Sequence, residues 1–169
     1  MKILGIDASL SSTGWCIINE DEEVLLYGKI CTKAKYSEFE RIYTIAIGIK
    51  KIIKENSINL VVCEDQYVNF NPKTALTLSR LLGAIIYVCE ELKVQIELIS
   101  PTSARRILLG KGNSTKKDVA FFINENYINL GEYSDKQTKT QEKNSDIFDA
   151  LCVSLAWLKK YILDRKYNK

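Results

Sequence analysis

The sequence predicts an α/β fold in which a five-stranded mixed sheet is covered by helices on both faces. Two apolar runs, KILGID at residues 2–7 and INLVVCE at 58–64, have strand length and contain several β-branched residues. Strands that are apolar throughout are typical of parallel sheets covered on both sides. STGWCIIN and EVLLYGKI, joined by the acidic turn EDEE, follow the first run as two further strands and predict a three-stranded antiparallel meander.

Helices alternate with the two remaining strands. Apolar residues from Ile42 to Ile53 recur at helical spacing, and Pro101 turns the chain out of a fifth strand at 94–99. The predicted helices span residues 38–55, 73–92, 115–127 and 145–163, with a short one from Pro101 to near Gly110. With 169 residues, 46% of them hydrophobic, the chain is expected to form a single domain over residues 1–169.

Two acids stand where apolar strands end. Asp7 closes the first strand and Glu64 closes the fourth. Ligand sites in open α/β sheets lie beyond the carboxyl ends of the strands, so parallel neighbours would bring these acids side by side. A single acid after a strand is more often the first residue of a solvated loop, and only the pair points to a site.

Two more acids open the last predicted helix. Asp146 and Asp149 follow Asn144 or Ser145 as the N-cap, where acids suit the helix dipole. Their spacing of three places them on one face of a helix that is apolar nearly all round, which indicates a buried helix. Buried carboxylates need partners, and a divalent cation suits several of them at once.

Composition restricts the chemistry. The chain has no histidine, which excludes Ser-His and Cys-His nucleophiles and histidine metal sites. Five scattered cysteines without a C-x-x-C pair indicate neither a zinc site nor a disulfide framework. Carboxylates alone favour Mg²⁺ or Mn²⁺. Neither a signal peptide nor a membrane-spanning run is visible, so we expect an intracellular protein.

Basic residues gather in one segment, although the net charge of the whole chain is only +3. The segment from Pro101 to Lys117 has no acid and contains Arg105, Arg106, Lys111, Lys116 and Lys117. Such a patch suits DNA binding through the phosphate backbone, but it also occurs by chance. Lys116 begins a helix capped by Ser114 or Thr115, where a phosphate would meet a cation and free amides; a solvated surface lysine is the plainer interpretation.

Four segments resemble, in order, the motifs of RuvC-type Holliday junction resolvases. They are GIDASLSSTGW, CEDQYVNFNPKTALTLSRLLGAI, SARRILLGKGNSTKKDV and NSDIFDALCVSLAW. Singly, G-I-D is weak and D-x-x-D-A-L moderate, whereas all four together are specific. The resemblance covers nearly the whole chain and implies a ribonuclease H-like fold, whose element order is the one predicted above.

The resemblance implies an endonuclease that resolves four-way (Holliday) DNA junctions in recombination, repair or phage DNA processing. The family's four catalytic carboxylates, which hold two divalent ions, match Asp7, Glu64, Asp146 and Asp149. The ions would be Mg²⁺, with Mn²⁺ able to substitute. The family works as a homodimer that cuts two strands symmetrically. The implied compartment is the cytoplasm of a bacterium or a phage-infected cell, and the sequence identifies no helicase partner.

Further residues match family positions that contact DNA. Lys116 falls at a basic residue near the active site, and Arg105 at one that contacts phosphate. Tyr67 falls at an aromatic residue that stacks on bases at the crossover; alone it would be read as a surface or core tyrosine. After Asp7 the family usually has Pro-Gly, whereas this chain has Ala8 and Ser9. A side chain there would alter substrate spacing rather than the chemistry.

The helix predicted at 73–92 carries two apolar stripes. One comprises Ala75, Leu78, Leu82, Ile85, Ile86 and Cys89, and the other Leu81, Ala84 and Val88. One stripe would cover the sheet and the other would meet a partner subunit, or both would be buried in one core. The pattern alone does not separate these alternatives.

Other function classes stay open. A strand ending in Asp and followed by S-S-T-G resembles the phosphate-binding hairpin of actin-like kinases and ATPases, but that class needs two such domains. The stretch GKGNSTKK lacks the Walker A spacing. A nuclease of the same fold for other branched DNA or RNA/DNA hybrids would use a similar acid set. A non-catalytic junction-binding protein would be expected to have lost an acid.

Overall fold

The sheet has the predicted mixed topology. The computed structural model describes residues 1–65, 72–138 and 143–167. The strand order is β3–β2–β1–β4–β5. The strands are β1 (Lys2–Asp7), β2 (Ser12–Asn19), β3 (Val24–Cys31), β4 (Leu60–Glu64) and β5 (Gln95–Ile99). The first three form the antiparallel meander, and β4 and β5 continue the sheet parallel to β1.

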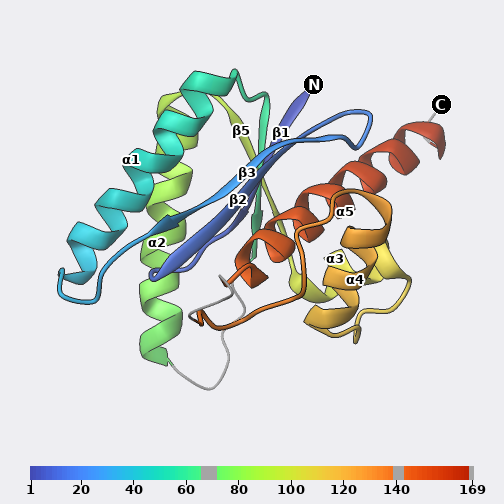
Figure 1. Ribbon diagram of the computed structural model, residues 1–169. Coiled ribbons are helices and arrows are strands. Elements are labelled where there is room, and N and C mark those ends of the chain that lie inside the picture. Colours follow the sequence, from blue (N-terminus) through green and yellow to red (C-terminus); the bar gives the residue numbers. More distant parts are fainter. Residues whose placement is uncertain (66–71, 139–142, 168–169) are drawn as a thin grey trace.

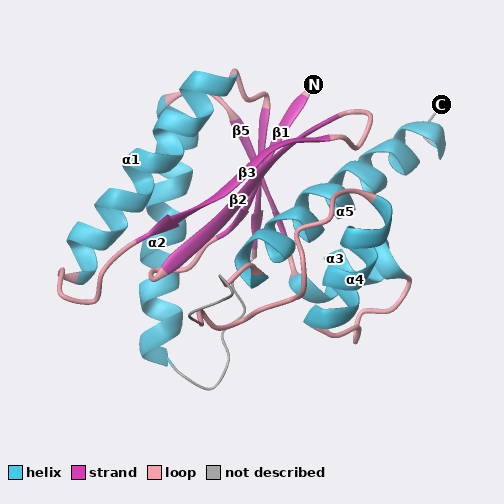
Figure 2. Ribbon diagram, viewed as in Figure 1, coloured by secondary structure: helices cyan, strands magenta, loops and turns pink. Residues whose placement is uncertain are grey.

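Helices cover both faces of the sheet, as predicted (Figure 1). They are α1 (Glu38–Asn56), α2 (Pro72–Glu91), α3 (Pro101–Leu109), α4 (Lys116–Asn126) and α5 (Ser145–Tyr167). Helices α1 and α2 lie on one face, and α5 lies on the other with α3 and α4 packed beside it (Figure 2). No helix in the described ranges is long and apolar enough to cross a membrane.

Alternation along the central strands divides the core between the two faces. On β1, Ile3 belongs to the core under α3, α4 and α5, whereas Leu4 and Ile6 belong to the core under α1 and α2. On β4 the same division separates Leu60 and Val62 from Val61 and Cys63. Successive side chains of a strand face opposite sides, so the next residues, Asp7 and Glu64, face α5.

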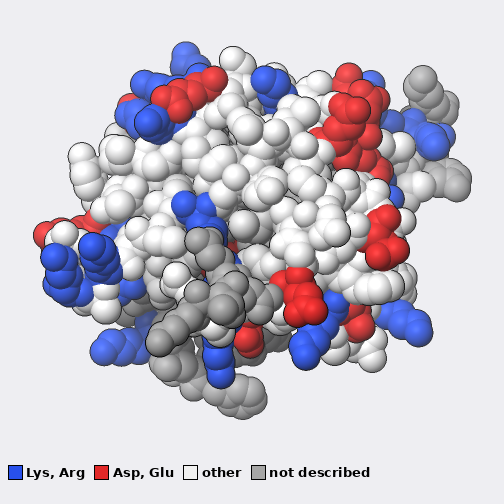
Figure 3. All heavy atoms as spheres, in the orientation of Figure 1, with Lys and Arg blue, Asp and Glu red and all other residues white. Residues whose placement is uncertain are grey.

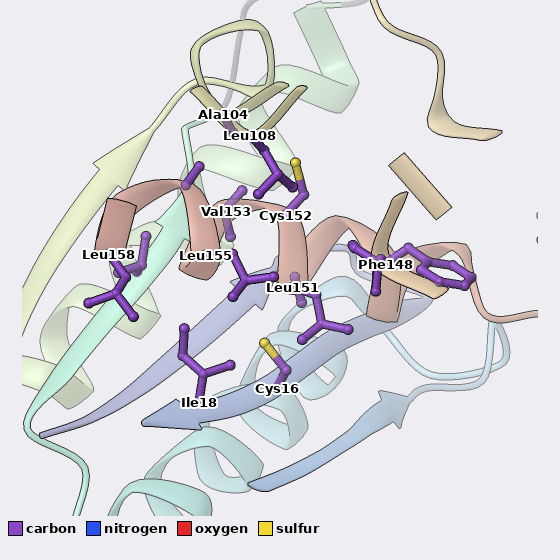
Figure 4. Packing of buried hydrophobic residues seen from close by; sticks show 14 of the residues in the cluster. Cys16, Ile18, Ala104, Leu108, Phe148, Leu151, Cys152, Val153, Leu155 and Leu158 are labelled. Atoms are coloured by element: carbon purple, nitrogen blue, oxygen red, sulfur yellow. The ribbon is translucent and has the colours of Figure 1, made fainter. Parts of the chain in front are cut away.

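Helix α5 is the centre of the core that lies under α3, α4 and α5. Every residue from 145 to 156 is buried, which confirms the prediction drawn from its apolar circumference. Figure 4 shows its side chains between β2, which supplies Cys16 and Ile18, and α3, which supplies Ala104 and Leu108. The two acids near its start, Asp146 and Asp149, are therefore surrounded by protein rather than by bulk water.

Two glycines let α5 approach the sheet closely. A Cβ atom on Gly5 would lie 2.4 Å from the backbone oxygen of Ala150, and one on Gly14 only 2.1 Å from the backbone oxygen of Asp146. Neither position has room for a side chain. Gly14 is the cross-strand partner of Asp7, so its contact with Asp146 sets the spacing between the acids of β1 and α5.

Helix α2 corrects the predicted division into two stripes. Leu81 and Val88, assigned to the stripe opposite that of Ile85 and Cys89, are buried together with them. One wide buried face therefore takes residues from both stripes, because the helix packs against α1 as well as the sheet. The large apolar side chains that α2 leaves exposed are Leu76, Ile86 and Tyr87.

Candidate active site

The four predicted acids gather at one edge of the sheet. Ile6 pairs with Cys63 in the parallel register of β1 and β4, so the residues that follow them, Asp7 and Glu64, end the two strands at the same level. Asp146 and Asp149 approach from the first turns of α5, and each is only 4% exposed. Three elements that are distant in sequence thus bring their carboxylates together.

The strand acids lie within electrostatic reach of the others. Burial raises the pKa of Asp7 well above its ordinary value, and the charges of Glu64 and Asp149 raise it further. Burial and the charge of Asp149 raise the pKa of Glu64 to about 7, although Lys116 and Arg105 oppose that rise. Carboxylates that resist ionisation together are the usual sign of a site built for an added cation.

Lys116 reaches the acids from the N-terminus of α4. Thr115, one of the two predicted caps, accepts a hydrogen bond from the backbone N–H of Asp118 and completes a capping box with it. The Lys116 ammonium donates to Asp149 Oδ2. Burial lowers the pKa of Lys116, but the charge of Asp149 and this hydrogen bond outweigh burial and leave the pKa raised.

A second lysine enters the site that sequence reasoning did not identify. Lys143 Nζ lies 2.7 Å from Asp146 Oδ1, and its side chain is 33% exposed. Ser145 Oγ donates to the same carboxylate oxygen at 3.1 Å. The other oxygen, Asp146 Oδ2, is buried without a hydrogen-bond partner. The sequence signal that could have identified Lys143 is its position three residues before Asp146, just before the helix begins.

Asn144 differs from its predicted role. Its backbone carbonyl accepts the first helical hydrogen bonds of α5, but its side chain does not cap the helix. The side chain instead accepts from the N–H of Ser134 and donates to the carbonyls of Leu130 and Glu132. It therefore ties the preceding loop to the start of α5, a long-range role that no local pattern predicts.

Asp7, Glu64 and Asp146 line a cleft of about 530 Å³. Three lysines from different elements line it: Lys73, Lys116 and Lys143. The lining also includes the hydroxyl residues Ser9, Ser11, Thr74 and Thr77. Of this lining, the sequence had assigned a site role only to Asp7, Glu64, Asp146 and Lys116, and had noted the turn at Ala8 and Ser9.

The turn after Asp7 accommodates the departure from Pro-Gly. Ala8 is buried in the core under α1 and α2. The buried hydroxyl of Thr13 donates to the carbonyl of Ser9 at 2.8 Å and accepts from the backbone N–H of Ser9 at 3.3 Å. These two hydrogen bonds fix the backbone conformation of the turn after Asp7. The Ser9 side chain lines the cleft.

The donor set fits a hard divalent cation. All four acids supply oxygen ligands, and Asp146 Oδ2 is a buried acceptor without a partner. Within the described residues, no three Asp, Glu or Cys side chains are already arranged to hold an ion. Lysine ammonium groups stand on Asp146 and Asp149 instead.

The predicted DNA contacts divide into two groups. Arg105 turns inward, donates to the carbonyl of Ser114 at 3.4 Å and lies near enough to Glu64 to oppose the rise of its pKa. Arg106, Lys111 and Lys117 are exposed. Tyr67 lies outside the described residues. On the face seen in Figure 3, basic side chains are interspersed with acidic ones rather than joined in one broad patch.

Comparison with known proteins decides the family. A family model described as crossover junction endodeoxyribonuclease RuvC matches residues 3–157. The chain belongs to the RuvC family. The RuvC of Aliarcobacter butzleri is 30% identical over 158 residues, which cover 92% of this chain and 96% of that protein. The RuvC of Wolbachia pipientis wMel is 32% identical over 134 residues, covering 77% and 83%.

Solved RuvC structures share the fold. Thermus thermophilus RuvC superposes with a TM-score of 0.77 at 19% identity, covering 96% of each chain. The same protein in complex with a Holliday junction substrate gives 0.76. The yeast mitochondrial Holliday junction resolvase Ydc2 gives 0.70 and covers 98% of this chain. The predicted ribonuclease H-like fold is thereby confirmed.

Proposed function

We propose that this protein is a structure-selective endonuclease that resolves four-way DNA junctions by metal-dependent hydrolysis of phosphodiester bonds. The observation that carries the proposal is the convergence of Asp7, Glu64 and Asp146 on one cleft, with Asp149 paired to Lys116 of the same cleft, in a member of the RuvC family. We infer that residues 1–169 form one nuclease domain, acting on DNA in the cytoplasm of a bacterium or a phage-infected cell.

The four acids would hold the metal. Bound Mg²⁺, or Mn²⁺ in its place, would activate a water and stabilise the departing oxygen of an in-line displacement, with two ions sharing the work. Asp7 and Glu64 come from rigid neighbouring strands, and the α5 acids are held in place by the contact at Gly14. The site is therefore built on elements that keep ligand positions fixed.

Basic groups would orient the DNA. Lys116 stands at the N-terminus of α4, where its ammonium and the helix dipole both favour a phosphate. Arg106 on α3, Lys111 in the following turn and Lys117 on α4 are exposed and would contact the DNA backbone farther out. Arg105 would act from inside the site, beside Glu64. Stacking of Tyr67 on an opened base stays a prediction.

A homodimer would match the symmetry of the substrate. A four-way junction has two equivalent strands to cut, and a twofold protein presents two equivalent sites. The side chains of Leu76, Ile86 and Tyr87 leave an exposed apolar surface on α2 that suits a subunit contact. Tyr87→Glu should then convert a dimer into a monomer in sedimentation experiments, whereas Tyr43→Glu, on α1, should not.

The decisive experiment is cleavage of a labelled synthetic four-way junction beside a linear duplex, a forked duplex and an RNA/DNA hybrid. Paired symmetric nicks on the junction, dependent on Mg²⁺ and abolished by chelation, would support the proposal. Preferential cutting of forks or hybrids would overturn the assignment of the four-way junction as substrate and leave the metal-site assignment intact. Junction binding without any cutting in Mg²⁺ or Mn²⁺ would overturn the enzymatic role.

A further inference from the structure

The two α5 acids each carry a lysine of their own. Lys116 pairs with Asp149, and Lys143 pairs with Asp146. Lys116 belongs to the motif that resembles the family, whereas Lys143 lies just before the last motif. Lys143 is thus a charged residue of the cleft to which the proposed function assigns no role.

Both ends of Lys143 are held in place. Its backbone carbonyl accepts a hydrogen bond from Lys29 Nζ, on β3, at 2.7 Å. The next residue, Asn144, is tied to the preceding loop by three side-chain hydrogen bonds. The ammonium then lies 2.7 Å from Asp146 Oδ1. This anchoring distinguishes the contact from that of a freely moving surface lysine.

The carboxylate that Lys143 neutralises is an unusual one. The Asp146 side chain is 6% exposed, and its Oδ2 atom has no hydrogen-bond partner. A buried carboxylate with one free oxygen is costly unless a cation stands beside it. The ammonium and a metal ion bound by Asp146 would be two cations competing for one carboxylate, since their charges repel at this distance.

We propose that Lys143 is an internal counter-ion of the metal site: its ammonium neutralises Asp146 in the metal-free protein and is displaced when a divalent cation binds there. This inference rests on the proposed metal site. By thermodynamic reciprocity, the ion pair must weaken metal binding by the same factor by which the metal weakens the ion pair. Lys143 therefore sets the metal concentration at which the site fills, and it keeps the empty site folded.

The test measures metal binding without DNA or activity. Free Mn²⁺ is quantified by electron paramagnetic resonance during titration of the metal-free full-length protein and its variants. Lys143→Met should bind Mn²⁺ about fivefold more tightly than the wild type, the scale of a partly exposed ion pair. Lys136→Met is the matched control, because Lys136 is an exposed lysine of the same loop and its loss changes the net charge equally. Its affinity should stay at the wild-type value.

A second readout separates the counter-ion from a general loop effect. In a chelator, Lys143→Met should unfold at a lower temperature than Lys136→Met, because Asp146 has lost its cation. Saturating Mn²⁺ should remove that difference. Lys143→Arg retains the charge and should restore wild-type Mn²⁺ affinity; if Lys143→Met does not fold, Lys143→Gln takes its place in both measurements.

The outcomes distinguish this inference from the metal site itself. If Lys143→Met and Lys136→Met bind Mn²⁺ equally, or if Lys143→Met binds it more weakly, the counter-ion role is overturned while the site stands. If Asp146→Asn leaves wild-type Mn²⁺ binding unchanged, Asp146 is not a ligand, and the metal-site assignment and the counter-ion role fail together.

Discussion

The two faces of one sheet have opposite designs. Under α1 and α2 the buried core carries no charged side chain and is mainly apolar, from Leu4 and Ile6 on β1 to Ile45 and Ile49 on α1. Under α5 the core is equally apolar along most of its length but ends, at the carboxyl edge of the strands, in four acids and their lysines. The same strands feed both faces, so the difference lies in what packs against them.

That difference separates stability from chemistry. Burial of apolar surface stabilises both faces, whereas Asp7 and Glu64 oppose folding in their ionised form, because burial and neighbouring carboxylates raise their pKa values. The raised pKa values of Asp7 and Glu64 reflect the free-energy cost of ionising carboxylates that are buried close together. Substitutions in the core under α1 and α2 are expected to change stability only. On the α5 face, small displacements of the site residues are expected to lower activity.

The largest effect is expected at the first acid. Asp7→Asn should lower the cleavage rate about a thousandfold or more, because transition-state stabilisation by a bound metal is worth several kcal/mol. Four-way junction binding should persist in a gel-shift assay. The neighbouring exposed acid gives the control, since Asp65→Asn should cut at the normal rate. Normal cleavage by Asp7→Asn would remove Asp7 from the site.

The second-largest effect is expected from a substitution at the closely packed Gly14. In Gly14→Ala the new Cβ would meet the backbone of Asp146, so α5 must shift. A displacement of this kind should cost about a hundredfold in cleavage, and overpacking about 1–3 kcal/mol in the free energy of unfolding. Cleavage kinetics and urea unfolding measure the two effects.

Gly83 on α2 is the matched control on the other face. A Cβ there would meet nothing within 4 Å. Because alanine is the better helix former, Gly83→Ala should stabilise the protein by up to about 1 kcal/mol. Equal losses in Gly14→Ala and Gly83→Ala would contradict the assigned role of the Gly14 contact.

A core change on the first face should affect stability alone. Ile49→Ala truncates a fully buried side chain of α1 and should lower the free energy of unfolding by about 2–5 kcal/mol. At a temperature where the variant is still folded, its cleavage rate should match the wild type. Ile49→Val should cost only about 0.5–1.5 kcal/mol. A large loss of cleavage in a folded Ile49→Ala protein would show that the two faces are coupled.

The last prediction is a pH dependence of the metal-free protein. Glu64 titrates near 4.5 when exposed, and the fold raises its pKa to about 7. Between these values the folded state holds more protons than the unfolded state, so stability should fall as the pH rises from 4.5 to about 7. Thermal unfolding in a chelator would show it, and Glu64→Gln should flatten the curve. A melting temperature that rises through this window would contradict the raised pKa.

Local pattern determined much of this protein in advance. The order of the strands and helices, and their bounds to within a residue or two in most cases, follow from apolar periodicity, Pro101 and Gly110. The placement of Asp7 and Glu64 at one sheet edge follows because both end apolar strands. Burial of Asp146 and Asp149 follows from the apolar circumference of their helix. Such features depend on neighbours in the chain, which a sequence displays directly.

Only the tertiary structure decided the contacts between distant segments. The buried face of α2 mixes the two predicted stripes because α1 packs beside it. Lys143 meets Asp146, Asn144 turns to the loop before it, and Gly14 admits the backbone of α5. Periodicity states which face of an element is apolar, but it does not state what will lie against that face. Close approach and charge pairing depend on distances that arise only when the elements pack.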